Sequence, residues 1–362
     1  MESKSFSSSI LYISFNQDSS CLALGLEYGY RIYNLTSNKL DFYERFLDGG
    51  IKIIEMLYTT NLLVLVGGGK NPKFSKNKII LYDENTSKII AEFSFTDYIS
   101  NVKIKKDRIF LVSDKNIIIL SLFNFKLIDK IDFSFQNKKG LIAVTYENDV
   151  NYLAFPDKAI GFVYIKTYKK FEVEKEGRIN AHEDEIACIN FDKNKYLATS
   201  SVNGKYLRIF KVENKVFLYQ FKFPCCLSVI NIEFDESDFV LCSTNVGKVY
   251  VFSLKNVKKE DDEKDYFFYD NNEENNVMIN NNNNIFKFFE KEENFWAVLN
   301  LNEKKIISTF VNGNFGKNKI VTISSKGNYY RSRFDVNKKG ENMIKEEEKN
   351  LDDFNFSNFK FI

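Results

Sequence analysis

The side chains best suited to holding an anionic group gather between positions 179 and 224. They comprise an imidazole, two hydroxyls and two cations: His182, Thr199, Ser201, Arg208 and Lys222. A lysine ammonium binds phosphate as a point charge, and hydroxyls can donate hydrogen bonds to the same group. These residue types could therefore form a phosphate pocket, provided that the fold brings them together.

Short apolar and alternating runs carry these residues, and such runs are typical of β-strands. They are IACINFD (186–192), YLATSS (196–201), YLRIF (206–210) and FLYQFKFP (217–224). Successive side chains of a strand point to opposite faces of the sheet. Adjacent residues at a strand end, such as Lys222 and Phe223, are therefore expected to serve two different sides of one sheet.

Comparable first strands recur along the whole chain, which indicates a repeat. They begin at Leu11, Ile51, Ile99, Leu141, Ile186, Val229 and Ile306, with spacings of 40, 48, 42, 45, 43 and 77 residues. Four short strands per unit of about forty residues are typical of propeller blades. In the first unit we expect strands at 11–15, 21–25, 30–34 and 40–46. The prediction is an all-β, seven-bladed β-propeller that closes a ring and forms a single domain over residues 1–362.

The last spacing is too long because of residues 255–294, a low-complexity segment rich in Asn, Asp and Glu. This segment includes the homopolymer at 280–284 and carries a net charge of −5, which leaves +7 on the remainder. Such a polar run cannot bury enough apolar surface to order itself. We expect a disordered loop between the third and fourth strands of blade six.

The stretch from 179 to 224 closely resembles the fifth blade of the PROPPINs, the phosphoinositide-binding propellers of autophagy. In that family the blade ends Phe/Leu-Arg-Arg-Gly, whereas this chain has the degenerate motif Phe221-Lys222-Phe223-Pro224. Residues 63–83 are similar to the family's second blade, 136–146 to the opening of its fourth, and 324–341 to its last. In the second-blade segment the matching positions are Gly67, Gly68, Pro72, Ser75 and Lys78.

The resemblance implies two head-group pockets, one on each side of blade five. His182, Thr199, Ser201, Arg208 and Lys222 match the first pocket. Ser243 and Thr244 match hydroxyl positions of the second pocket, whose arginine is replaced by Phe223. Each charge-assisted hydrogen bond contributes roughly 1.5–3 kcal/mol, so loss of a two-pronged arginine costs about a hundredfold in affinity. We predict a weakened first pocket and a second pocket that is lost or repurposed.

Structural interpretations remain open for the same residues. A lone His at a turn, such as His182, is most often a local hydrogen-bonding residue. Arg208 could equally form a structural ion pair, and the hydroxyls of Thr199 and Ser201 could bond backbone between blades. For Phe223 and Pro224, ordinary packing between blades is the better interpretation.

Enzyme functions fit the composition poorly. A single histidine excludes His-rich metal sites and disfavours a Ser-His-Asp arrangement. The Gly67–Lys70 run lacks the spacing of a phosphate-binding loop. A net charge of +2 does not favour nucleic-acid binding. No run is long enough to span a membrane, and five scattered cysteines suggest a reducing compartment. We expect no enzyme activity and no cofactor.

The resemblance further implies a monomeric, cytoplasmic adaptor on autophagic, endosomal or vacuolar membranes. Its ligands would be phosphatidylinositol 3-phosphate or 3,5-bisphosphate. Lipid-transfer or conjugation factors would dock in grooves between early blades, near residues 67–78. Aromatic clusters at 266–269 and 285–289 would contact the membrane interface. The alternatives are a protein scaffold that has lost lipid binding and, more distantly, a WD-type propeller. The latter is disfavoured because the chain has one tryptophan and no recurring Trp-Asp ends.

Overall fold

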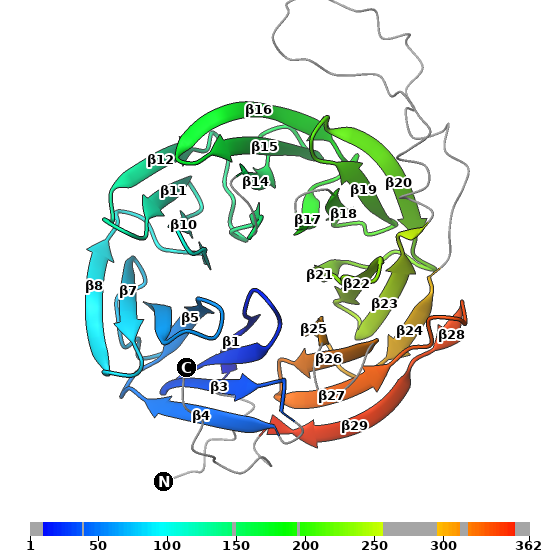
Figure 1. The fold of residues 1–362 in the computed structure, drawn as a ribbon, viewed down its shortest axis with the longest axis horizontal. Coiled ribbons are helices and arrows are strands. Elements are labelled where there is room, and N and C mark those ends of the chain that lie inside the picture. The colour runs from blue at the N-terminus through cyan, green and yellow to red at the C-terminus, as the bar shows by residue number, and fades with distance from the viewer. Residues whose placement is uncertain are drawn as a thin grey trace, which may run out of the picture. The chain divides into compact units, whose positions relative to one another are not determined.

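The computed structural model describes residues 10–37, 40–146, 150–193, 196–255, 295–311 and 318–351. These residues form seven antiparallel sheets, the blades of a seven-bladed β-propeller (Figure 1). The predicted all-β fold is confirmed. The chain divides into two compact units. Unit 1 comprises Met1–Leu141, Leu299–Asn337 and Asn342–Ile362, and unit 2 comprises Ile142–Val298 and Lys338–Glu341.

Unit 1 contains blades 1, 2, 3 and 7; strands pair with their neighbours along the chain, except that β27 of blade 7 pairs with β29. Blade 1 comprises β1 (Ile10–Phe15), β2 (Cys21–Leu26), β3 (Gly29–Asn34) and β4 (Asp41–Phe46). Blade 2 comprises β5 (Ile51–Met56), β6 (Leu62–Gly67), β7 (Lys78–Asp83) and β8 (Lys88–Ser94). Blade 3 comprises β9 (Asn101–Ile104), β10 (Arg108–Val112), β11 (Asn116–Ser121) and β12 (Leu127–Asp132). Blade 7 comprises β25 (Ile306–Val311), β26 (Lys319–Ser324), β27 (Asn328–Arg333) and β29 (Ile344–Asn350).

Unit 2 contains blades 4 and 5 and most of blade 6. Blade 4 comprises β13 (Ala143–Val144), β14 (Val150–Pro156), β15 (Phe162–Lys169) and β16 (Glu172–Asn180). Blade 5 comprises β17 (Ile186–Asp192), β18 (Tyr196–Ser201), β19 (Tyr206–Lys211) and β20 (Val216–Lys222). Blade 6 comprises β21 (Val229–Phe234), β22 (Phe239–Thr244), β23 (Lys248–Ser253), β24 (Ala297–Asn300) and the short β28 (Glu341–Asn342).

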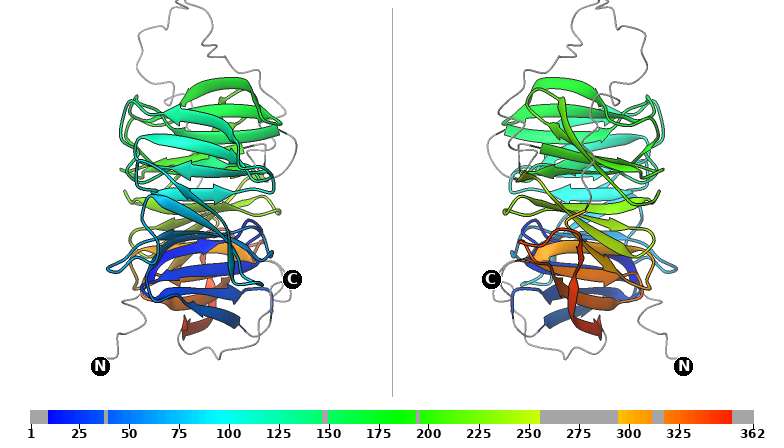
Figure 2. Two further views of the ribbon diagram at one scale, coloured as in Figure 1. Left: turned by 90° about the vertical axis from the view of Figure 1, so that its left-hand side faces the viewer. Right: turned by 90° about the vertical axis from the view of Figure 1, so that its right-hand side faces the viewer.

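Burial explains why the second strands of several blades consist mainly of apolar and small residues. Every residue of β2, β18 and β22 is buried, whereas β8 and β12 at the outer edges are largely exposed. A strand covered on both faces reads as a continuous run of small and apolar residues, and a strand with one open face does not. Figure 2 shows the strands of each blade lying beside one another as one sheet.

The predicted first strand of every blade exists. All four predicted strands of blade 1 agree with the observed strands to within one residue at each end. One strand escaped sequence reasoning. In blade 6, β28 adds a fifth strand beside β24, and the amide of Gly340 donates to the carbonyl of Trp296 at 2.8 Å. Two residues are too few for a periodic pattern to reveal.

The long insertion of blade 6 lies where it was predicted, because β23 ends at Ser253 and β24 begins at Ala297. Except for Lys255, the segment 255–294 is outside the described residues, as are the aromatic clusters 266–269 and 285–289. Over the ranges that the structure does describe, no helix has the length and apolar character needed to cross a membrane.

Candidate functional site

The register of blade 5 aligns polar side chains across three strands. Thr199 of β18 pairs with Arg208 of β19, which pairs with Gln220 of β20. One step along, Tyr206 pairs with Lys222. Cross-strand partners lie on the same face of a sheet, and residues two apart in a strand share that face. These side chains therefore form one polar face, which we call the polar face of blade 5.

His182 joins this face from the turn that follows β16. Its Nε2 lies 2.9 Å from Oγ1 of Thr199, and its amide donates to the carbonyl of Gly161 at 3.0 Å. The guanidinium of Arg208 donates through Nη1 to the carbonyl of Ala181 at 2.7 Å. The structure thus brings His182, Thr199 and Arg208 together. By strand alternation, buried Ser201 belongs to the same face.

Burial decides the protonation of this cluster. Desolvation, followed by the charge of Arg208, lowers the pKa of His182 to about 3. Desolvation also lowers the pKa of Arg208 to about 10, against the opposing charge of Glu183. At neutral pH the imidazole is neutral and the guanidinium is charged, so the charge of this cluster comes from Arg208.

Lys222 lies half-buried at the end of β20, on the polar face and opposite Tyr206. Two cationic side chains lie beside the ring of Tyr206. The Nζ of Lys205 is 5.2 Å from its centroid, and the Cζ of Arg208 is 5.4 Å from it. Sequence reasoning missed Lys205 because it lies in a turn and belongs to no motif; its position directly before YLRIF was the one available signal.

Backbone contacts hold the chain after Lys222 against the turn that carries Lys205. The amide of Phe223 donates to the carbonyl of Lys205 at 3.0 Å, and that of Leu227 to the carbonyl of Gly204 at 3.3 Å. Gly204 has a φ of +48°, and a Cβ there would come within 1.2 Å of the Leu227 carbonyl oxygen. Only glycine permits this approach, so the turn and the end of β20 form one fixed unit.

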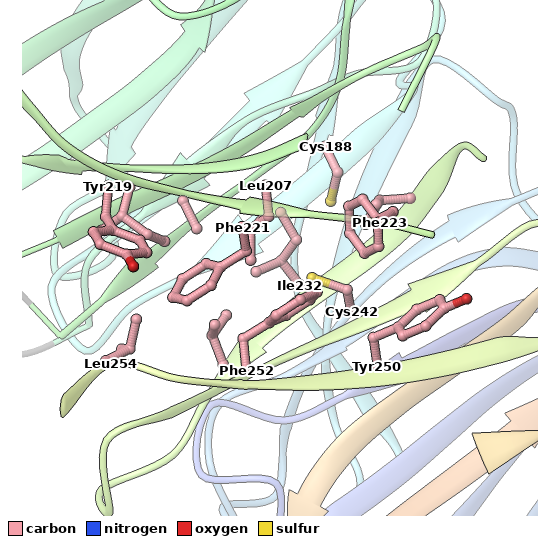
Figure 3. Packing of buried hydrophobic residues seen from close by; sticks show 14 of the residues in the cluster. Cys188, Leu207, Tyr219, Phe221, Phe223, Ile232, Cys242, Tyr250, Phe252 and Leu254 are labelled. Carbon is pink, nitrogen blue, oxygen red and sulfur yellow. The ribbon is translucent and has the colours of Figure 1, made fainter. Parts of the chain in front are cut away.

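The opposite face of blade 5 is apolar, and Phe223 lies on it. Its ring packs against Tyr250 and Phe252 of blade 6, with centroid distances of 5.4 Å to each (Figure 3). Phe221 lies two residues earlier on the same face, 4.9 Å from Phe252. Both phenylalanines are at most 2% exposed. Aromatic rings therefore fill the space where the second arginine of the motif was expected.

The two hydroxyls expected in a second pocket lie on different faces of blade 6. Ser243 pairs with Asn231 and donates to its Oδ1 at 3.4 Å, whereas the neighbouring Cys242 faces the aromatic cluster. Thr244 shares the face of Cys242, but its hydroxyl donates to the carbonyl of Lys248 at 2.9 Å within its own turn. The structure does not bring Ser243 to Phe223.

Comparison with known proteins agrees with this arrangement of blades. The PROPPIN family profile matches residues 9–349. The chain belongs to the PROPPIN family. Its relatives include one protein named as autophagy-related and another named as phosphoinositide-interacting.

Two curated relatives and one solved structure illustrate the similarity. Autophagy-related protein 18 of Debaryomyces hansenii is 29% identical over 68% of this PROPPIN and 51% of the relative. WD repeat domain phosphoinositide-interacting protein 2 of Gallus gallus is 29% identical over 69% of this chain and 58% of the relative. The chain thus spans little more than half of these two proteins. A solved complex of KlAtg21 with the coiled coil of AgAtg16 has a TM-score of 0.69 at 16% identity, covering 95% of this chain and 99% of that chain.

Acid should destabilise this PROPPIN through His182. Its folded pKa of about 3 lies below the unfolded value of about 6.5, so the unfolded state binds the proton first as pH falls. The contribution is complete above pH 6.5 and diminishes below it. Between pH 7 and pH 5 we expect about 2 kcal/mol of loss from this residue, measured by urea unfolding. In His182→Gln the loss of unfolding free energy between pH 7 and pH 5 should be smaller by that amount. If the variant and the wild type lost the same free energy, the assignment would be contradicted.

Restoring the motif at position 223 should damage the fold. Phe223→Arg places a charge between blades 5 and 6 within an aromatic cluster, which should cost more than about 3 kcal/mol. Phe223→Leu should cost roughly 1–2 kcal/mol, since it removes volume without adding charge. Denaturant unfolding of both variants measures the difference. A Phe223→Arg protein as stable as the wild type would show that this space can open.

Proposed function

We propose that this PROPPIN is a non-catalytic, phosphoinositide-binding adaptor of autophagy or vesicle traffic. Its ligand would be a lipid of the phosphatidylinositol 3-phosphate or 3,5-bisphosphate type. The observation that carries the proposal is the polar face of blade 5, where one register aligns Lys222, Arg208 and Thr199. The name of the Gallus gallus relative, a phosphoinositide-interacting protein, supports the same ligand class.

A single weakened pocket follows from the two faces of blade 5. On the polar face, a lysine at position 222 supplies charge without the planar fork that an arginine presents to phosphate. On the other face, Phe223 supplies neither charge nor donor. The Ser243 and Thr244 hydroxyls bond within blade 6, so we assign them no part in the surviving pocket. Membrane association would be peripheral, on autophagic, endosomal or vacuolar membranes.

Vesicle binding by matched variants tests the lipid proposal. We expect wild-type protein to bind vesicles containing phosphatidylinositol 3-phosphate more strongly than vesicles of phosphatidylcholine alone. Lys222→Ala should weaken binding at least about tenfold, because it removes a charge-assisted contact, and Lys222→Arg should strengthen it. Flotation and surface plasmon resonance provide the affinities.

The control is Lys193→Ala, which removes an exposed lysine of blade 5 at the turn between β17 and β18, where it pairs with Glu236 at 3.3 Å. This variant should bind as the wild type does. Equal binding to both vesicle types by the wild type and Lys222→Arg would reject the lipid function. The alternative, a protein scaffold that has lost lipid recognition, would then hold. The aromatic rings that fill the apolar face of blade 5 favour that alternative.

A protein partner is the second part of the proposed adaptor role. Blades 2 and 3 expose four large apolar side chains on their outer strands and the turn before β12: Ile89, Ile90, Phe123 and Leu127, each at least 50% exposed. We call this set the apolar rim. We propose that these four side chains together form an interaction site, which an amphipathic helix can cover with its own apolar stripe. The related structure with a coiled-coil partner leads us to propose a coiled coil as the occupant.

Our sequence-based expectation placed the partner at residues 67–78 instead. This turn lines a pocket of about 650 Å³ to which Ser75 and Asn77 contribute, together with Lys52, Lys115 and Tyr98. Gly67 is required there, since a Cβ would come within 1.7 Å of the Phe74 carbonyl oxygen. The pocket is polar and suits a charged segment, so it remains the alternative docking place.

Substitution can distinguish the two docking places. We expect Ile90→Ser combined with Phe123→Ser to abolish pull-down of a coiled-coil autophagy factor, because each exchange removes exposed apolar area. Tyr98→Ala removes a 71%-exposed side chain that lines the pocket. This variant should leave pull-down intact. The reverse pattern would transfer the partner to residues 67–78. All three side chains are exposed, so the fold should tolerate their replacement, as circular dichroism can verify.

A further inference from the structure

Arg208 cannot present its guanidinium fully to a ligand. Its Nη1 donates to the Ala181 carbonyl at 2.7 Å, its Nε reaches Oε1 of Gln220 at 3.4 Å, and the residue is 5% exposed. These contacts tie the strand to the turn that carries His182. Arg208 therefore acts as a positioning residue, and the head-group cations must come from elsewhere on the polar face.

Two lysines flank Tyr206, a residue of the polar face. Lys222 is half-buried and directly opposite Tyr206 across the β19–β20 ladder. Lys205 is exposed and places Nζ 5.2 Å from the centroid of the Tyr206 ring. Cβ atoms of directly opposed residues lie about 5 Å apart. The Lys205 ammonium therefore lies beside the Tyr206 ring, and the Lys222 side chain starts from the position directly opposite that ring.

The position of Lys205 is fixed by backbone contacts rather than by chance. Its carbonyl accepts the amide of Phe223, the residue after Lys222. The neighbouring Gly204 packs against the Leu227 carbonyl. The turn that holds Lys205 and the strand end that holds Lys222 are thus bonded to each other, so the two lysines keep a constant relation.

We infer that Lys205 is the second head-group cation of this PROPPIN, and that it acts with Lys222 as a pair beside Tyr206. The pair takes over the charge that two arginines would supply. This inference rests on the proposed lipid function and adds to it the residue and the mode of recognition.

Ammonium groups act as compact point charges, whereas an arginine fork matches the geometry of phosphate oxygens. A lysine pair should therefore respond to the number of phosphates on the inositol ring more than to their positions. Phosphatidylinositol 3-phosphate is the proposed monophosphate ligand, and we expect the other two monophosphate isomers to bind within about tenfold of it. Bisphosphate lipids should bind more tightly, because they carry more charge for the same two lysines.

The experiment uses full-length protein and vesicles of phosphatidylcholine that contain equal molar amounts of each phosphoinositide. Ionic strength is held constant because salt screens exposed charges. Lys205→Ala should weaken binding about tenfold, and Lys205→Arg should retain it. Lys193→Ala, at the turn between β17 and β18, is the control for removal of one surface charge and should bind as the wild type does.

The outcomes separate this inference from the proposed function. Binding that falls in Lys222→Ala but not in Lys205→Ala would overturn the lysine pair and leave the lipid function intact. Wild-type preference for one monophosphate isomer by more than tenfold would overturn recognition by charge. Absence of phosphoinositide-dependent binding in the wild type would overturn the lipid function itself, and the inference with it.

Discussion

The alternation of side chains at the end of β20 governs the chemistry of this PROPPIN. Lys222 and Phe223 are neighbours in the chain, yet they face opposite sides of blade 5. One side receives an ammonium group and the other an aromatic ring. Because the ring is enclosed by Tyr250 and Phe252, the apolar side contributes to stability. The polar side alone remains available for an anionic ligand.

Polar contacts behind the accessible lysines keep that side ordered. His182 is neutral because it is buried beside a guanidinium, and it shares a hydrogen bond with Thr199. Arg208 bonds the carbonyl next to His182. Buried polar groups are costly unless they have partners, so these contacts stabilise the junction between the turn after β16 and blade 5. Several residues that resemble ligands thus have a structural task as well.

Much of the fold was readable from the sequence because propeller strands are short, apolar and regularly spaced. The first strand of every blade was predicted, and so was the place of the blade-six insertion. The two-residue β28 was not, since its pairing with β24 depends on a contact between distant segments. Lys205 was not found either: a lysine in a turn has no pattern, and only its proximity to Tyr206 distinguishes it from other surface lysines.

The sequence by itself determined the blade repeat, the family and the degenerate motif at 221–224, because local periodicity and residue order suffice for these. It also predicted that residues 222 and 223 would face opposite ways, which follows from strand geometry alone. Only the tertiary structure decided that Arg208 is engaged by protein groups, that Ser243 lies on the face away from Phe223, and that the backbone of Lys205 bonds to the residue after Lys222. Those outcomes depend on how a turn or strand packs against segments distant in the chain, and such packing leaves no local pattern.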